Sequence, residues 1–217
     1  MNKEYNAYLF DADGTLLDTF EMIYQCFQHT LGKYDGPDVD RKTIESHVGI
    51  PLRTQLEHYL GELDDKMAAE IVKTHGDYQY RIYKDYLQPF PDVLSVLSRL
   101  KNAGKKLAVV TSRREPSISD YLEHIGALDL FTAIITPDHA ERPKPHPAPV
   151  LKALSELGVD KGDALFVGDA VYDIQAGNSA GVDTAFVSWS KVDLNGHTPT
   201  YRINSFTELL PDSVQVK

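Results

Sequence analysis

The 217-residue sequence predicts an α/β fold, a doubly wound parallel (Rossmann-like) sheet with an inserted all-helical domain. Three observations lead to this prediction. Short apolar segments alternate with amphipathic helical patterns, the connections between them are short, and one stretch near the N-terminus contains helical patterns alone. Alternation of strand and helix is typical of βαβ units, in which the strands are parallel. The exclusively helical stretch therefore indicates an insertion into that core.

Five short apolar segments are predicted to be buried strands. They are residues 5–10, 106–111, 133–136, 164–167 and 184–187. Residues 201–203, which follow a polar stretch with the turn-forming pair Asn195-Gly196, are predicted to be a last edge strand. The helices between the strands are predicted from apolar residues at helical spacing that stop just before a glycine, a residue favoured after a helix C-terminus. These helices cover residues 93–100, 118–125 and 150–157, followed by Gly104, Gly126 and Gly158.

The predicted insertion covers residues 18–87, where three helical stripes begin at Phe20, Leu52 and Met67 without a strand candidate between them. Pro89 and Pro91 mark the return to the core, because their fixed φ angles suit a stiff connection. The predicted α/β domain therefore consists of residues 1–17 and 88–217, and the helical domain of residues 18–87.

Composition excludes several functional classes. The chain has 22 basic and 32 acidic residues, a net charge of −10, which repels nucleic acid and anionic lipid, so neither is an expected partner. The single cysteine, Cys26, excludes an internal disulfide and fits a reducing compartment. No apolar run approaches the roughly 20 residues that span a bilayer, and the N-terminus lacks the pattern of a secretory signal. We therefore expect a cytoplasmic protein that does not enter a membrane.

The first predicted strand ends in Asp11-Ala12-Asp13-Gly14-Thr15-Leu16. Ligands of open α/β sheets bind beyond the carboxyl ends of the strands, so both carboxylates are expected at the functional edge. An isolated acidic turn also serves as a helix N-cap. The whole string, however, is expected by chance at a rate on the order of 10⁻⁴ in a chain of this size. It therefore indicates a functional site.

Three later segments are expected to bring polar groups to the same edge. Thr111 and Ser112 follow the second strand, although such a pair is often only an N-cap. Lys144 lies between prolines in a loop, where most lysines are simply solvated. Asp169 and Asp173 follow the strand at residues 164–167, and either could instead cap the next helix. Each signal is modest alone, and their conjunction favours a phosphoryl-transfer site.

In this order, the motifs resemble those of the haloacid dehalogenase superfamily of phosphohydrolases: Asp11/Asp13, Thr111, Lys144 and Asp169/Asp173. The resemblance covers nearly the whole chain. It also identifies the helical insertion as the cap domain that this superfamily places after the first strand. The nearest likeness is to phosphoglycolate phosphatases and to related bacterial pyrophosphatases.

The resemblance implies a phosphatase that acts on a small phosphorylated metabolite through an aspartyl-phosphate. Asp11 would be the nucleophile, and a reference pKa near 3.9 predicts that it is ionised without a base. Asp13 would protonate the leaving oxygen and then deprotonate the hydrolytic water. Backbone N–H groups after Asp11, beginning with Ala12, would face the phosphate oxygens. Thr111, Ser112 and Lys144 would bind the phosphoryl oxygens.

Charge explains why a metal is expected at this site. Four aspartates bring up to −4, Lys144 returns +1, and a phosphate adds about −2, a sum that would expel the substrate. Mg²⁺ suits oxygen ligands. The resemblance implies that Asp11, the Asp13 carbonyl, Asp169 and Asp173 hold it.

Five residues lead to further expectations. Ala12 stands where a larger apolar residue is frequent in the family. Ala170 stands where Ser or Asn is often found, and this change predicts weaker metal binding. Arg113 and Arg114 are expected to be exposed at the start of a helix rather than to bind substrate. Arg53, in the Gly49-Ile50-Pro51-Leu52-Arg53 loop, is a candidate for substrate selection because family likeness places this loop at the active site.

Several alternatives remain open from the sequence. An inorganic pyrophosphatase fits the same motifs, and a phosphomutase like β-phosphoglucomutase uses the same nucleophile and cap. Receiver domains, a signalling class, also present an acidic pocket with a phosphoacceptor Asp on a doubly wound sheet, but they lack the helical insertion. The protein is expected to be a monomer or a homodimer.

Overall fold

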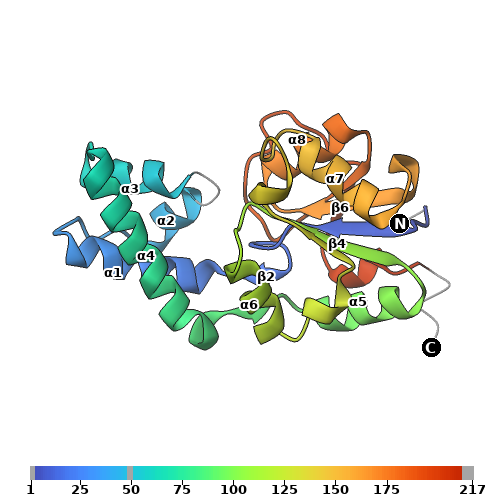
Figure 1. Ribbon diagram of the computed structural model, residues 1–217, viewed down its shortest axis with the longest axis horizontal. Coiled ribbons are helices and arrows are strands. Elements are labelled where there is room, and N and C mark those ends of the chain that lie inside the picture. Colours follow the sequence, from blue (N-terminus) through green and yellow to red (C-terminus); the bar gives the residue numbers. More distant parts are fainter. Residues whose placement is uncertain (1–2, 48–50, 212–217) are drawn as a thin grey trace. The chain divides into compact units, whose positions relative to one another are not determined.

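The computed structural model describes residues 3–47 and 51–211 (Figure 1). The chain divides into two compact units, Met1–Asp18 with Gln88–Lys217, and Thr19–Leu87. We call the first the α/β unit and the second the helical unit. Among the helices of the described ranges, none has both the length and the apolar character needed to cross a bilayer.

The α/β unit contains a six-stranded sheet in the order β5-β4-β1-β6-β7-β8. Its strands are β1 (Ala7–Phe10), β4 (Lys106–Val110), β5 (Ala133–Ile135), β6 (Ala164–Gly168), β7 (Asp183–Val187) and β8 (Tyr201–Ile203). All neighbouring pairs are parallel. The predicted fold class is confirmed, and the predicted strands differ from the observed ones by no more than two residues at either end.

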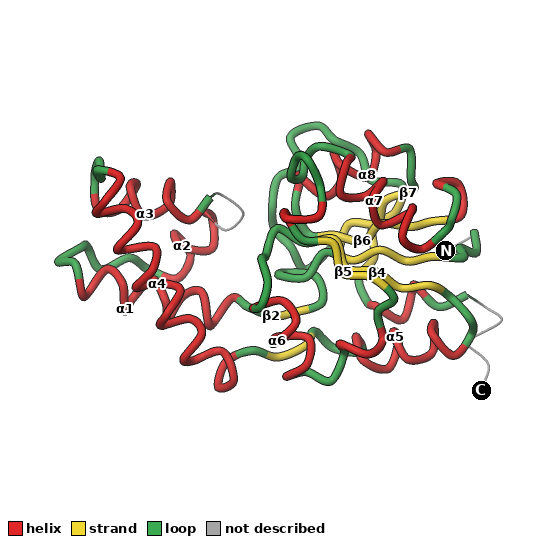
Figure 2. The backbone as a smooth tube through the Cα atoms, viewed as in Figure 1, coloured by secondary structure: helices red, strands yellow, loops and turns green. Residues whose placement is uncertain are grey.

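Helices cover both faces of this sheet (Figure 2). They are α5 (Val93–Asn102), α6 (Ser117–His124), α7 (Ala148–Leu157) and α8 (Val171–Ala180). In Figure 1, α7 and α8 lie on one face and α5 lies on the other. Gly158 ends α7 in the left-handed conformation, at φ +59°, as its position after the apolar pattern predicts.

Alternate residues of β1 enter two different cores because side chains of a strand point to opposite faces. Ala7 and Leu9 pack in the cluster that includes Val150 and Leu154 of α7. On the opposite face, Tyr8 donates a hydrogen bond to the Leu209 carbonyl, and the Phe10 ring stacks on Phe206 with centroids 6.1 Å apart. Burial on both faces fixes the position of the strand that directly precedes Asp11.

The helical unit contains α1 (Phe20–Lys33), α2 (Arg41–His47), α3 (Leu52–Leu60) and α4 (Asp65–Tyr86). Its core is apolar, and the buried members are Phe27, Leu31, Val39, Ile44, Leu56 and Ile71. The three predicted stripes correspond to α1, α3 and α4. The sequence analysis missed α2 because this helix is short and, among its residues whose burial is described, only Ile44 belongs to that core.

Two short strands were also absent from the prediction. β2 (Leu17–Asp18) and β3 (Gln88–Pro89) pair antiparallel where the chain leaves and re-enters the α/β unit. The Phe90 N–H also donates to the Leu16 carbonyl at 3.0 Å. Backbone hydrogen bonds therefore join the segment that leaves the α/β unit to the segment that returns to it.

Candidate active site

Three adjacent strands end level with one another at one edge of the sheet. Phe10 of β1 pairs with Val109 of β4 and with Val167 of β6. The residues that follow these pairs therefore lie side by side at the carboxyl edge, where open α/β sheets bind ligands. This register places Asp11 between the end of β4 and the end of β6.

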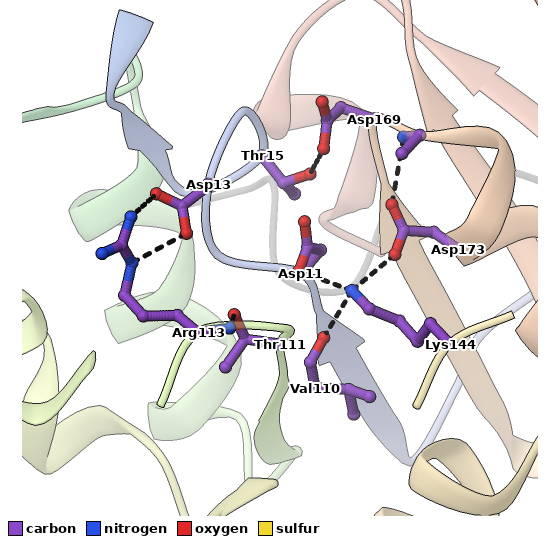
Figure 3. A network of polar contacts seen from close by, with 10 residues as sticks. Asp11, Asp13, Thr15, Val110, Thr111, Arg113, Lys144, Asp169 and Asp173 are labelled. Carbon is purple, nitrogen blue, oxygen red and sulfur yellow. Dashed lines mark hydrogen bonds and ion pairs between the residues drawn. The ribbon is translucent and has the colours of Figure 1, made fainter. Parts of the chain in front are cut away.

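Lys144 joins two carboxylates at this edge (Figure 3). Its Nζ lies 2.7 Å from Asp11 Oδ1 and 2.7 Å from Asp173 Oδ1, and it donates a third hydrogen bond to the Val110 carbonyl at 3.0 Å. The Lys144 side chain is only 5% exposed. The other oxygen of Asp173 accepts from the Ala170 N–H at 3.0 Å, a backbone contact that does not require Ser or Asn at that position.

Asp169 completes an acidic cluster. Asp11, Asp169 and Asp173 each offer a carboxylate oxygen within 4.8 Å of the others. Asp169 Oδ1 accepts from the Thr15 hydroxyl at 3.1 Å, which orients the carboxylate. All three clustered groups are hard oxygen donors of the kind that Mg²⁺ prefers.

The cluster changes the pKa values of its members. Burial, reinforced by Asp173 and Asp13, raises the pKa of Asp11 to about 7 against the opposing effect of Lys144. Burial and the charges of Asp11 and Asp173 raise the pKa of Asp169 well above its ordinary value. Burial alone would lower the pKa of Lys144, but Asp11 and Asp173 raise it. The expectation that Asp11 keeps its reference pKa is therefore wrong, because it ignored burial beside other carboxylates.

Gly14 is required beside Asp169. Its φ is +79°, and a Cβ atom added there would lie 2.3 Å from Asp169 Oδ2. Glycine therefore permits both the turn and the close approach of the loop to this carboxylate.

Asp13 lies outside the acidic cluster because its carboxylate is paired with Arg113. Arg113 Nε donates to Asp13 Oδ2 at 2.9 Å, and Arg113 Nη2 donates to Oδ1 at 2.7 Å. The Arg113 side chain is 13% exposed. The expectation of an exposed residue is therefore wrong for Arg113, whose partner is distant in sequence. Arg114 is exposed as expected and pairs with Asp138.

Apart from Lys144, the residues predicted to bind phosphoryl oxygens lie on the loops after β1 and β4. Thr111 is buried, and its Oγ1 accepts from the Arg113 N–H at 3.0 Å, which leaves the hydroxyl hydrogen free to donate. Ser112 is exposed, whereas Ala12, in the loop after β1, is fully buried. In Figure 3, the Thr111 side chain lies next to the Arg113 backbone.

Arg53, the predicted selectivity residue, belongs to the helical unit. It lies in α3, half exposed, and pairs with Glu57 at 2.9 Å and Asp65 at 2.8 Å. Gly49 and Ile50 of the predicted loop lie outside the described residues.

The sequence analysis did not find two loop residues that support the site. The indole of Trp189 donates to the Gly14 carbonyl at 3.0 Å, and the Ser190 hydroxyl donates to the Asp169 carbonyl at 2.7 Å. Their position directly after β7, at the same sheet edge, was the available signal. They connect the loops after β1 and β6 to the loop after β7.

A parallel α/β sheet with buried carboxylates and a lysine at its carboxyl edge is typical of an α/β enzyme whose ligand binds at that edge. Residues 8–187 match the family of haloacid dehalogenase-like hydrolases. The chain belongs to this family.

Relatives and solved structures agree with this assignment. The chain is 32% identical to the pyrophosphatase PpaX of Bacillus velezensis, over 96% of both chains, and 33% identical to that of Bacillus pumilus, over 94% of both. Its fold is similar to the crystal structure of a predicted phosphoglycolate phosphatase from Haemophilus somnus, with a TM-score of 0.87 and 22% identity over 96% of this chain and 98% of the other. CbbY from Rhodobacter sphaeroides, solved in complex with phosphate, gives a TM-score of 0.81 at 22% identity over 98% and 100% of the chains. The protein is therefore related to phosphatases.

Proposed function

We propose that this protein is a Mg²⁺-dependent phosphatase that hydrolyses a small phosphoglycolate-like metabolite through an aspartyl-phosphate on Asp11. The observation that supports this proposal most directly is the convergence of Asp11, Lys144, Asp169 and Asp173 at one sheet edge.

The donor set fits a divalent cation. Asp11 Oδ2 and Asp169 Oδ2 accept no hydrogen bond from any residue within ranges 3–47 and 51–211, so both oxygens are available as ligands. We assign Mg²⁺ to Asp11, Asp169, Asp173 and the backbone carbonyl of Asp13. When bound, the ion supplies positive charge that offsets the carboxylates and polarises the phosphoryl group.

The residues of the chain then divide the reaction into two transfers. An Asp11 oxygen forms a bond to phosphorus while the bond from phosphorus to the leaving oxygen breaks, and Asp13 gives its proton to that oxygen. Water next attacks the phosphorus, the bond from phosphorus to Asp11 breaks, and the proton of the water passes to Asp13. Throughout, Lys144 neutralises charge on Asp11, and the Thr111 hydroxyl and the Ala12 and Ser112 N–H groups bind phosphoryl oxygens.

Release of inorganic phosphate from a panel of small phosphoesters tests the proposal. We expect activity with Mg²⁺, none in EDTA, and a loss of about 10⁴-fold or more in Asp11→Asn. Asp129→Asn, which alters an exposed aspartate of the same unit, is the matched control. Persistent activity in Asp11→Asn would exclude the covalent route.

Metal binding has a separate readout in Trp189, the only tryptophan of the chain. Its indole is bonded to the Gly14 carbonyl, next to Asp169. We expect Mg²⁺ to change its fluorescence in the wild type and to have no such effect in Asp169→Asn. An unchanged signal in both proteins, together with activity in EDTA, would contradict the metal assignment.

Pyrophosphate is the second candidate substrate, because the two Bacillus relatives at 32% and 33% identity are named pyrophosphatases. Including it in the panel decides between the two, since kcat/KM compares competing substrates directly. A larger kcat/KM for pyrophosphate than for phosphoglycolate would replace the phosphomonoesterase assignment.

We place the protein in the cytoplasm, as a monomer or homodimer without a nucleic-acid partner.

A further inference from the structure

The pairing of Arg113 with Asp13 is a two-point contact. Each nitrogen of one guanidinium edge donates to a different Asp13 oxygen, at 2.9 and 2.7 Å. A fork of this kind fixes the plane of a carboxylate as well as its position, which a single hydrogen bond does not. Asp13 is thereby held in one orientation.

Other contacts hold Arg113 itself in place. Its backbone N–H donates to Thr111 Oγ1 at 3.0 Å, and its guanidinium carbon lies 4.4 Å from the centre of the Tyr121 ring. The carboxylate charge of Asp13 raises the pKa of Arg113 above its ordinary value although burial opposes this. The contacts connect the loop after β1 to the loop after β4 and to α6.

This network is separate from the acidic cluster. In Figure 3 the Asp13 carboxylate turns toward Arg113, while Asp11 and Asp173 turn toward Lys144. The two cations therefore bind different carboxylates. Lys144 binds Asp11, which is proposed to attack phosphorus, and Arg113 binds Asp13, which is proposed to transfer the proton. Proton transfer requires the donor within hydrogen-bond reach of the leaving oxygen, so orientation of Asp13 bears directly on the rate.

We propose that Arg113 is a positioning residue that aims the Asp13 carboxyl at the leaving-group oxygen. The inference rests on the proposed function and concerns its first transfer. In that transfer the bond from phosphorus to the leaving oxygen breaks and the bond from Asp11 to phosphorus forms. A proton carried by neutral Asp13, on an oxygen lone pair that the Arg113 fork does not use, moves to the leaving oxygen and leaves the forked carboxylate. Arg113 exchanges no atom with the substrate and acts only through Asp13.

Leaving groups of different basicity test this role. An alkoxide needs the proton from Asp13, whereas p-nitrophenolate leaves readily without it. The ratio kcat/KM reports only steps up to the first irreversible one, so it isolates this transfer from hydrolysis of the intermediate. In Arg113→Met we expect kcat/KM to fall about 10- to 100-fold for 2-phosphoglycolate and less than about 3-fold for p-nitrophenyl phosphate.

Two further variants complete the design. Arg113→Lys keeps the charge but not the fork, so it should restore part of the loss on 2-phosphoglycolate. This variant also provides the test if Arg113→Met does not fold, which circular dichroism of the purified proteins reveals. Arg114→Met, a change to the exposed neighbouring arginine, should leave both substrates unaffected.

The outcomes separate this inference from the proposed function. Equal losses on both esters, or no loss on either, in the folded Arg113 variants would overturn the positioning role. Wild-type protein that releases no phosphate from either ester would overturn the proposed function itself. A loss confined to 2-phosphoglycolate, with partial recovery in Arg113→Lys, supports the inference.

Discussion

The α/β unit and the helical unit treat buried polar groups differently. At the sheet edge of the α/β unit, three buried or half-buried carboxylates converge from distant segments around Lys144. In the helical unit, the buried Thr30 and His75 side chains bond to each other, at 3.1 Å. Concentrated charge is costly to bury and is found where chemistry requires it, whereas the helical unit is stabilised by packing. Substitutions at the sheet edge should therefore have the larger effects.

Lys144→Met should produce the largest change in stability. The substitution leaves the carboxylates of Asp11 and Asp173 without their shared cation, and breaking such a buried pair typically costs about 3–5 kcal/mol. Urea denaturation in EDTA measures the free energy of unfolding. Lys152→Met, which removes an exposed pair with Glu156, is the matched control and should change it little. Equal stabilities of the two variants would show that the Lys144 cluster adds nothing to stability.

The helical unit should respond to acid through His75. Burial, with a smaller effect of His29, lowers the pKa of His75 to about 4 from 6.5. Between pH 6.5 and 4, the imidazole of His75 is therefore protonated in the unfolded chain but not in the folded chain. As the pH falls through this interval, the free energy of unfolding decreases by about 3 kcal/mol. His75→Gln removes this contribution, so its stability should decline less from pH 7 to 4 in urea denaturation. Parallel curves for the two proteins would refute the prediction.

Gly14→Ala tests the close approach of the loop to Asp169. A Cβ atom at φ +79° is strained and would also lie 2.3 Å from Asp169 Oδ2. Gly104→Ala introduces the same strain at φ +77° with no atom within 4 Å, so it is the matched control. Strain costs each variant about 1–2 kcal/mol, and the clash should cost Gly14→Ala about 2 kcal/mol more. Only Gly14→Ala should weaken the Mg²⁺ response of Trp189 fluorescence, and equal behaviour of both variants would argue against the contact.

Arg53→Gln should have the smallest effect on stability, because the ion pairs of Arg53 with Glu57 and Asp65 are exposed to solvent. If Arg53 selects substrate, the variant should change the ranking of kcat/KM values across the phosphoester panel while its melting temperature stays near that of the wild type. An unchanged ranking would remove Arg53 from the candidates for selectivity.

Much of the α/β unit was predictable because of how its strands are buried. β1, β4 and β6 are covered on both faces, so their sequences are nearly continuous apolar runs. The helix α2 and the two-residue strands β2 and β3 leave no comparable pattern, since all three are short and β2 pairs with β3 far away in sequence.

Contacts between residues distant in sequence also limited the prediction of the site. Asp11 and Asp169 follow strands and could be placed at one edge from the strand pattern alone. Arg113 could not, because its orientation depends on the Thr111 hydroxyl, the Tyr121 ring and a carboxylate 100 residues away. The pKa of Asp11 likewise depends on burial among neighbours that only the folded chain supplies.

The position of β1 in the sheet has a consequence for biosynthesis. β1 lies between β4 and β6, and both partners are encoded after the helical unit. On the ribosome, β1 must therefore remain unpaired until residues 106–110 emerge, and its second neighbour follows only with residues 164–168. Thr19–Leu87 is continuous in the chain and can acquire its structure meanwhile. Asp11 is translated before Lys144, Asp169 and Asp173, and it reaches its final surroundings only after all three have emerged.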